Sequence, residues 1–243
     1  FESSILNAQN LSIHDIQKGV SVFNGSVFTV DGMQIKKITS ESDALEIFTG
    51  SVVTITNGII KESDATCVNL HSGGKITLAD SIVEKCNVGI AENAGIGPIR
   101  ITLNHTKIRD NAIGMTMIAG VLTSTNSGIF QNESGFENYG NQSIQVENVW
   151  WGSASGPSHA TNASGTGNTI SGDVDFSPWL TVNPFPEDEP SDDDPPPPLV
   201  PSAPLYTQYQ SPHPSLAETA SWANMTYANG QNGSCGTTIA GCG

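Results

Sequence analysis

A degenerate six-residue motif, which we call the phrase, recurs along the chain with different residues in each copy. This repeat constrains the fold more than any other feature. The copies are VDGMQI, ITNGII, LADSIV, LNHTKI, STNSGI and VENVWW. They start at Val30, Ile55, Leu78, Leu103, Ser124 and Val146, so that successive starts are 25, 23, 25, 21 and 22 positions apart. A period in the low twenties is typical of a solenoid, in which each repeat forms one coil.

A large apolar residue closes every copy of the phrase. These residues are Ile35, Ile60, Val83, Ile108, Ile129 and Trp151. One coil must order some twenty residues at roughly 1 to 2 kcal/mol each, whereas each fully buried Ile or Leu returns only about 1.5 to 3 kcal/mol. Because a single coil cannot fold alone, we expect these side chains to form one inward-facing stack in a core that all coils share.

Short runs of alternating apolar residues flank the phrase and predict strands. The preceding runs are 27–30, 53–55, 76–78, 101–103 and 144–146, and the following runs are 44–48, 66–70, 88–91 and 113–117. With the phrase itself they give about three short strands per coil, separated by Gly, Asn, Asp and Ser. The pattern favours a coil of parallel strands over a leucine-rich horseshoe, whose signature is absent from the sequence.

The third residue of each phrase belongs to a type that tolerates left-handed backbone or hydrogen bonds locally to it. The column contains Gly32, Asn57, Asp80, His105, Asn126 and Asn148. It predicts a tight corner that is stacked from coil to coil, and it favours a turn role for His105 above Asp80. Since the five histidines show no metal-ligand spacing, we expect neither a metal site nor a cofactor.

The repeat region ends in two distinctive segments, NVWWGSASGP and GNTISGDVDFSPWL. Through the repeats and these segments, residues 1–180 resemble the right-handed parallel β-helix family of exported bacterial proteins. The resemblance implies an all-β, right-handed parallel β-helix solenoid of about six to seven coils, closed at its end by a C-terminal aromatic cap. The cap would consist of Trp150, Trp151, Phe176 and Trp179.

The beginning of the sequence shows no matching cap. Phe1 to Ser3 falls in phase with Val30 to Gly32, and Leu6 then falls where Ile35 does. Since the chain opens inside a coil and has no initiator Met, we expect it to be a fragment that lacks its signal peptide.

The charge of the chain narrows the choice of partners. It contains 9 Lys and Arg against 24 Asp and Glu, which gives a net charge of -15. This balance disfavours nucleic acid and anionic membrane surfaces, and no apolar run reaches the roughly 18 residues that insertion into a membrane requires. We expect an exported protein, extracellular or on the cell surface, of unknown oligomeric state.

The stretch PEDEPSDDDPPPP follows the expected cap. Proline and like charges both extend a chain, so we interpret residues 181–203 as a Pro/acidic linker between two folded bodies. A calcium-binding role is the alternative interpretation.

Residues 204–243, unlike the Pro/acidic stretch before them, are again rich in aromatic and small residues, and they end in TTIAGCG. They resemble the truncated start of a C39-like (papain-fold) cysteine peptidase domain, through Gln208, Trp222 and the Gly-Cys-Gly around Cys242. The resemblance implies that Cys242 is the nucleophile, activated at a helix N-terminus, and that the Gln208 amide donates to the oxyanion.

The family's His base and its Asn or Asp partner would lie downstream of the sequence, so the chain as given would be inactive. The alternative is a small disulfide loop between Cys235 and Cys242. For Cys67 and Cys86, in neighbouring coils, we favour simple core packing and keep a disulfide bridge as the alternative.

An enzyme built on this fold needs clustered carboxylates, either to hold Ca²⁺ or to act as an acid and base pair. The acids of the repeat region are isolated, although Glu84 and Asp110 can approach each other because both follow the aligned apolar position. We therefore expect a non-catalytic β-helix.

An aligned column of threonines precedes the phrase in five copies: Thr29, Thr54, Thr77, Thr102 and Thr123. It is either an outward ladder that meets a repetitive surface, such as polysaccharide or ice, or simply β-favouring Thr on a sheet, which we favour.

Three functions follow from the sequence. In the first, the solenoid binds glycan or acts as a rigid spacer for the C39-like domain, with polysaccharide or peptide as the substrate. In the second, the protein is an adhesin or structural surface stalk whose C-terminal segment is disulfide-bonded. In the third, the β-helix is a carbohydrate-active lyase or hydrolase.

Overall fold

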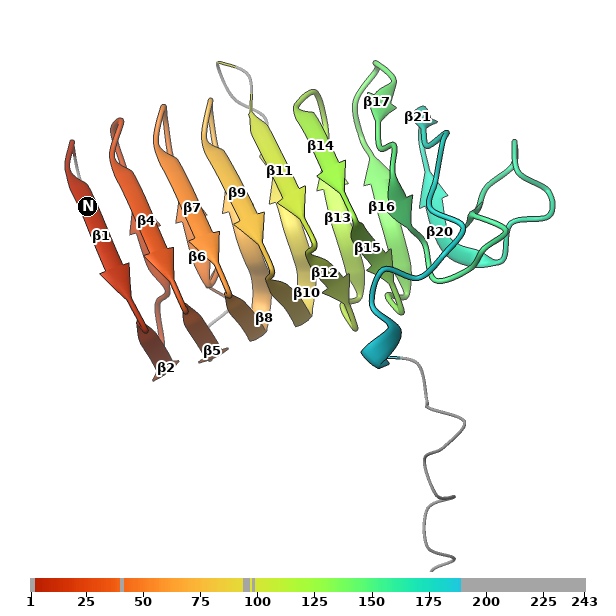
Figure 1. The fold of residues 1–243 in the computed structure, drawn as a ribbon. Helices are drawn as coiled ribbons and strands as arrows, with labels where there is room; N and C mark the ends of the chain where they lie inside the picture. Colours follow the sequence, from red (N-terminus) through yellow and green to blue (C-terminus); the bar gives the residue numbers. More distant parts are fainter. Residues whose placement is uncertain (1–2, 40–41, 94–96, 98, 189–243) are drawn as a thin grey trace, which may run out of the picture. The chain divides into compact units, whose positions relative to one another are not determined.

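The computed structural model describes residues 3–39, 42–93, 97 and 99–188. Their strands stack coil upon coil from β1 to β20 and β21 (Figure 1). The predicted all-β parallel solenoid is confirmed, with six coils that each contribute a strand to the first sheet. In the part of the chain that is described, we find no helix with the length and apolar character that crossing a bilayer demands.

The first sheet takes one strand from each coil, and all of its neighbouring strands are parallel. Its strands are β1 (Ile5–Gln9), β4 (Val27–Asp31), β7 (Val52–Thr56), β9 (Lys75–Ala79), β11 (Arg100–Asn104) and β14 (Val121–Thr125). Their side chains alternate between the core and the outside, as a strand surface requires.

A second sheet of thirteen strands forms the other two walls of the solenoid. One wall contains β2 (Ser12–Ile16), β5 (Gln34–Ile38), β8 (Ile59–Leu70), β10 (Ile82–Glu92), β12 (Lys107–Arg109), β15 (Ser127–Phe130) and β18 (Val149–Trp150). The other contains β3 (Val20–Val22), β6 (Leu45–Ile47), β13 (Ile113–Met117), β16 (Ser134–Asn138), β19 (Pro157–Ser158) and β20 (Gly167–Ser171). The long strands β8 and β10 pair with strands of both walls and so continue from one into the other.

The remaining strands, β17 (Ile144–Gln145) and β21 (Val174–Asp175), form a separate parallel pair. A short 3-10 helix, η1 (Pro186–Asp188), ends the described chain.

The apolar stack expected from the repeat is present. Ile60 pairs with Ile35 on one side and with Val83 on the other, and the column continues through Ile108 to Ile129. All five side chains are at most 1% exposed. The coils therefore lie directly over one another, and their shared core offsets the entropy that one coil cannot offset alone.

The predicted corner column is confirmed by the backbone. Gly32 has φ +74°, and the five other residues of the column have φ between +46° and +57°. Asn10, with φ +51°, occupies the same corner in the first coil. In the six coils of the first sheet these residues turn the chain from that sheet into the next wall, and Asn148 occupies the equivalent corner after β17.

The first coil lies in a different phase from the one expected. Leu6 pairs with Phe28, and Ile13 is the residue that pairs with Ile35. The placement of Leu6 is wrong because an additional copy of the phrase, AQNLSI from Ala8, supplies the corner residue and the apolar closing residue of this coil.

Cys67 of β8 and Cys86 of β10 form a disulfide with a Cα–Cα distance of 5.7 Å. The disulfide bridge, which was the alternative interpretation of these cysteines, is thus present, and the expectation of two unbridged core cysteines is wrong. Parallel stacking brings the two residues together because β8 and β10 are neighbours.

The aromatic cap covers the last coil with three of the four expected residues. Trp151 and Phe176 are buried in the main core, and Trp179 packs against it. Trp150 instead joins Phe130 and Phe185 in a separate cluster, because adjacent residues of a strand face opposite sides.

Phe185 belongs to a segment, residues 181–188, that we call the strap and that lies inside the predicted linker range. Its ring is fully buried, with its centroid 5.9 Å from that of Phe130 and 5.0 Å from that of His105. Lys107 Nζ lies 4.8 Å from the ring centroid and 3.0 Å from Glu187 Oε1. These contacts fix the strap on the wall formed by β12 and β15.

Candidate binding cleft

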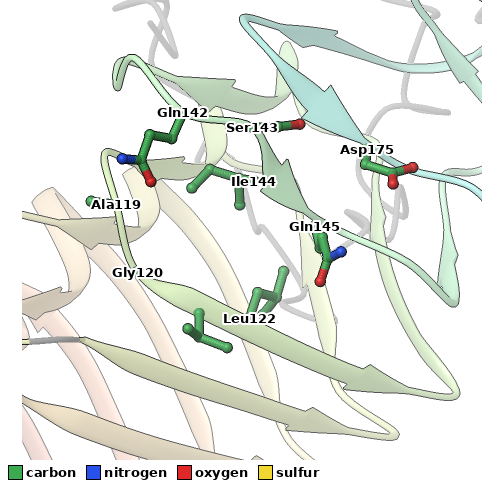
Figure 2. Close-up of a pocket in the computed structure, with 9 residues that line it drawn as sticks. Ala119, Gly120, Leu122, Gln142, Ser143, Ile144, Gln145 and Asp175 are labelled. Atoms are coloured by element: carbon green, nitrogen blue, oxygen red, sulfur yellow. The ribbon is translucent and has the colours of Figure 1, made fainter.

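The wall of the solenoid is interrupted between its sixth and seventh coils. β14 is the last strand of the first sheet, and the strand that follows it in the next coil, β17, pairs with β21 instead. A cleft of about 360 Å³ opens where β14 and β17 face each other (Figure 2). The edge of a strand without a partner presents backbone N–H and C=O groups, which are ready hydrogen-bonding sites.

The cleft has an apolar floor and a polar rim. Leu122 of β14 and Ile144 of β17 supply the floor, and Leu122 is 8% exposed where its equivalent in the preceding coil, Ile101, is 1% exposed. The whole lining is Ala119, Gly120, Val121, Leu122, Gln142, Ser143, Ile144, Gln145 and Asp175. Because no strand of the next coil continues the first sheet beyond β14, part of the apolar core beside β14 is accessible to solvent.

The polar side chains of the rim are exposed and come from the β17 segment and from β21. Gln145 of β17 is in register with Asp175 of β21, so these two side chains lie on the same outward face. Gln142 lies beside Ala119, and Gln145 lies farther along the cleft (Figure 2). Within the described residues, the side-chain amides of Gln142 and Gln145 make no hydrogen bond, so both are available to a ligand.

Glu92 holds the end wall of the cleft in place. Its carboxylate accepts hydrogen bonds from the backbone N–H groups of Ile118 at 3.0 Å, Ala119 at 3.2 Å and Gly120 at 2.8 Å. The side chain is buried at the end of β10, and an added Cβ at Gly120 would come within 2.9 Å of its Oε2 atom. Glu92 therefore fixes the loop that leads into β14.

Two other hollows differ from the cleft in their setting. One, of about 570 Å³, is lined by residues of β1, β4 and β7 within a single sheet. The other, of about 370 Å³, is surrounded by charged residues around Lys37, Glu62 and Lys85. The cleft between β14 and β17 is walled by strands of two sheets and combines apolar and polar groups, which is the usual character of a small-ligand site.

Glu84 and Asp110 do approach each other, but a cation lies between them. Arg109 Nε is 3.2 Å from Glu84 Oε2 and 3.7 Å from Asp110 Oδ2, and Lys61 Nζ is 3.7 Å from Glu84 Oε1. This arrangement is an ion-pair network on the outer face of the solenoid. It fits structural charge compensation better than an acid and base pair across a substrate.

His105 occupies the corner position expected for it. Its Nδ1 atom lies 3.0 Å from Asp80 Oδ1 in the preceding coil, and both residues have φ +47°. The threonine column is continuous as well, since Thr29, Thr54, Thr77, Thr102 and Thr123 pair in register on the outer face of the first sheet.

The two residues predicted for peptidase chemistry, Cys242 and Gln208, lie outside the described residues, as does Cys235. Their roles remain predictions from the sequence.

Sequence reasoning missed the residues of the cleft. The relevant signal is weak: β14 carries Ser124 at the inward position where the earlier coils have Leu103 and Leu78. A polar residue there indicates that the core is ending, but the sequence does not reveal that β17 pairs with β21.

Comparison with protein-family models matches residues 2–150 to the right handed beta helix region. Neither the comparison with curated proteins nor the comparison with solved structures finds a match.

Proposed function

The chain belongs to the right-handed β-helix family, and on this basis we propose that its solenoid is a non-catalytic module that binds a neutral glycan in the cleft between β14 and β17. The fold is shared by many activities, so the proposal rests on the chemistry of the cleft. The observation that carries it is a pair of unbonded amides, Gln142 and Gln145, over an apolar floor.

The hydrogen-bonding and apolar groups of the cleft complement the hydroxyl groups and C–H faces of a sugar. Amides, the Ser143 hydroxyl and the Asp175 carboxylate offer the donors and acceptors that sugar hydroxyls use, and Leu122 and Ile144 offer apolar surface to the C–H faces of the ring. The volume of about 360 Å³ falls at the lower end of the roughly 300 to 1,000 Å³ of small-molecule sites. A short glycan unit therefore suits the cleft better than a long chain.

Charge favours a neutral ligand. Asp175 is the one charged residue of the cleft lining, and the whole chain carries a net charge of -15. Both repel acidic sugars.

The test is a calorimetric titration of the full chain with a panel of neutral and acidic oligosaccharides. We expect Gln145→Ala to weaken the binding of a neutral oligosaccharide about tenfold, because one or two hydrogen bonds at about 0.5–1.5 kcal/mol each are lost. Thr102→Ala, on the outer face of the same solenoid, is the matched control and should bind like the wild type. Absence of binding, or equal weakening in both variants, would refute the proposal.

A rigid spacer for a C39-like cysteine peptidase domain is the second function that we propose. It is supported by the continuous register of six coils, which span roughly 24 Å at the strand spacing of about 4.8 Å, and by the strap, which fixes the end of the described chain through Phe185 and Lys107. Alkylation of Cys242 without reductant tests the cysteine peptidase part of this proposal. Labelling that requires prior reduction would instead favour the Cys235–Cys242 disulfide.

We also propose that the protein is exported to an extracellular or cell-surface location. The Cys67–Cys86 disulfide supports this proposal, since such bonds persist in oxidising compartments.

A further inference from the structure

Three metal-ligating side chains from neighbouring coils meet on the wall that contains β6. Asp43 lies just before β6, Glu46 lies within it, and His71 directly follows β8. One donor atom from each lies within 4.8 Å of the others. We propose that these three residues bind a divalent transition-metal ion of the zinc type, independently of any ligand in the cleft.

His71 provides the most specific argument. Its side chain is 27% exposed, but its Nε2 atom is buried and, among the described residues, has no hydrogen-bond partner, although it faces Glu46 Oε1 at 4.0 Å. A buried nitrogen without a partner costs free energy, and coordination to a cation removes this cost. The orientation of the ring is fixed, because it stacks on Phe48 with a centroid distance of 4.3 Å and an interplanar angle of 2°.

The two carboxylates are also held in position. Asp43 accepts hydrogen bonds from the Thr66 backbone N–H at 3.1 Å and from Asn69 Nδ2 at 2.6 Å. Glu46 Oε2 accepts from Ser21 Oγ at 2.8 Å, which leaves Glu46 Oε1 directed towards His71. A carboxylate has about four lone-pair positions, so both groups can bind an ion while they keep these contacts. Partners of this kind typically orient the ligands of a metal.

The donor set indicates which ion fits. One imidazole and two carboxylates suit Zn²⁺ and similar transition metals, whereas Ca²⁺ takes six to eight oxygen ligands. At metal–ligand distances of about 2.0–2.2 Å, two ligands of a tetrahedral ion lie about 3.4 Å apart. Small inward shifts of the side chains from their present spacing would complete the site, with a water molecule in the fourth position.

The ion would join consecutive coils of the solenoid. Asp43 and Glu46 belong to the second coil and His71 ends the third, while Ser21 connects the first coil to Glu46. The spacing of the histidines along the sequence does not indicate this set, because His71 lies about one coil after Asp43 and Glu46.

The test uses the full chain after removal of bound metal. Zn²⁺ is titrated by calorimetry, and Co²⁺ is added as a spectroscopic probe of tetrahedral coordination. We expect the wild type to bind one Zn²⁺ per chain, and His71→Gln and Glu46→Gln each to weaken this binding at least about tenfold and to abolish the tetrahedral Co²⁺ absorption. His105→Gln is the matched control, because His105 faces the single carboxylate of Asp80, and it should bind as the wild type does.

Circular dichroism of each variant shows whether it folds, and Asp43→Asn replaces any variant that does not. The proposal is overturned if the wild type binds no Zn²⁺, or if the variants bind it as tightly as the wild type, which would place the ion on other acidic groups of the chain. Displacement of Zn²⁺ by equimolar Ca²⁺ would likewise contradict the proposed donor chemistry.

Discussion

The side chain of Asn132 reaches the backbone of Asn111 one coil before it: Asn132 Oδ1 accepts a hydrogen bond from the Asn111 N–H at 3.0 Å. Asn111 Oδ1 accepts in the same way from the Cys86 N–H at 3.0 Å, and Asn168 Oδ1 from the Asn132 N–H at 3.1 Å. Asn132 Nδ2 also donates to the Ile108 carbonyl at 3.0 Å. This ladder satisfies backbone groups at a buried bend that the strand pairing leaves open.

Removal of the Asn132 amide should destabilise the solenoid. We expect Asn132→Ala to lower the free energy of unfolding by about 2 kcal/mol, because buried donors and acceptors lose their partners. Urea denaturation measures this change. Asn104→Ala, an exposed asparagine on the first sheet, should stay within about 0.5 kcal/mol of the wild type, and equal losses in both variants would show that the ladder adds no stability.

The Cys67–Cys86 disulfide should contribute to stability by restricting the unfolded chain. The two residues are separated by 19 positions, and a loop of about this size predicts roughly 3 kcal/mol. The Cys67→Ala, Cys86→Ala double variant should therefore unfold at lower urea concentration than the oxidised wild type. Addition of reductant should destabilise the wild type and leave the double variant unchanged; a wild type that does not respond to reductant would rule out this contribution.

Glu92 should control the shape of the cleft. In Glu92→Gln, one acceptor oxygen becomes an amide donor facing the N–H groups of Ala119 and Gly120, which should cost about 1–3 kcal/mol of stability and weaken glycan binding. Calorimetry and urea denaturation together measure both effects. Glu133→Gln, which changes an exposed carboxylate, is the control; a Glu92→Gln protein indistinguishable from it would mean that the loop holds its shape without Glu92.

The strap should loosen in acid. A hydrogen bond from its own backbone N–H, together with the neighbouring Lys107 ammonium, lowers the pKa of Glu187 below its ordinary value of 4.5. Because the folded pKa is depressed, the stabilisation is complete above about pH 4.5 and is lost as the pH falls through the lower folded pKa. Hydrogen exchange of residues 181–188 between pH 6 and pH 3 should show this loss in the wild type and a smaller pH dependence in Glu187→Gln.

The repeat carried enough information to predict the core and the corners. Ile60, Val83 and Ile108 recur at the same position of the phrase, and in-register parallel pairing follows once one coil must cover the next. The first coil was misplaced at Leu6 because AQNLSI keeps only the corner Asn and the closing Ile in common with the other copies. The structure identifies this copy through the pairing of Ile13 with Ile35, whereas its residue identities alone do not.

The residues of the two candidate sites are brought together by contacts between coils that the phrase does not encode. The cleft exists because β17 pairs with β21 rather than with β14, and the Asp43, Glu46 and His71 cluster exists because β6 lies beside β8. Both strand pairings depend on the lengths and paths of the irregular loops between the strands. The spacing of residues along the sequence does not predict these paths.

The proposed glycan site is tested most directly by amide chemical shifts recorded while the bound oligosaccharide is titrated into the labelled protein. Ligand binding in the cleft predicts that the largest changes occur at Gly120, Leu122 and Gln145. Changes confined to the threonine column around Thr77 and Thr102, or no changes at saturating oligosaccharide, would contradict the assignment of the cleft as the binding site.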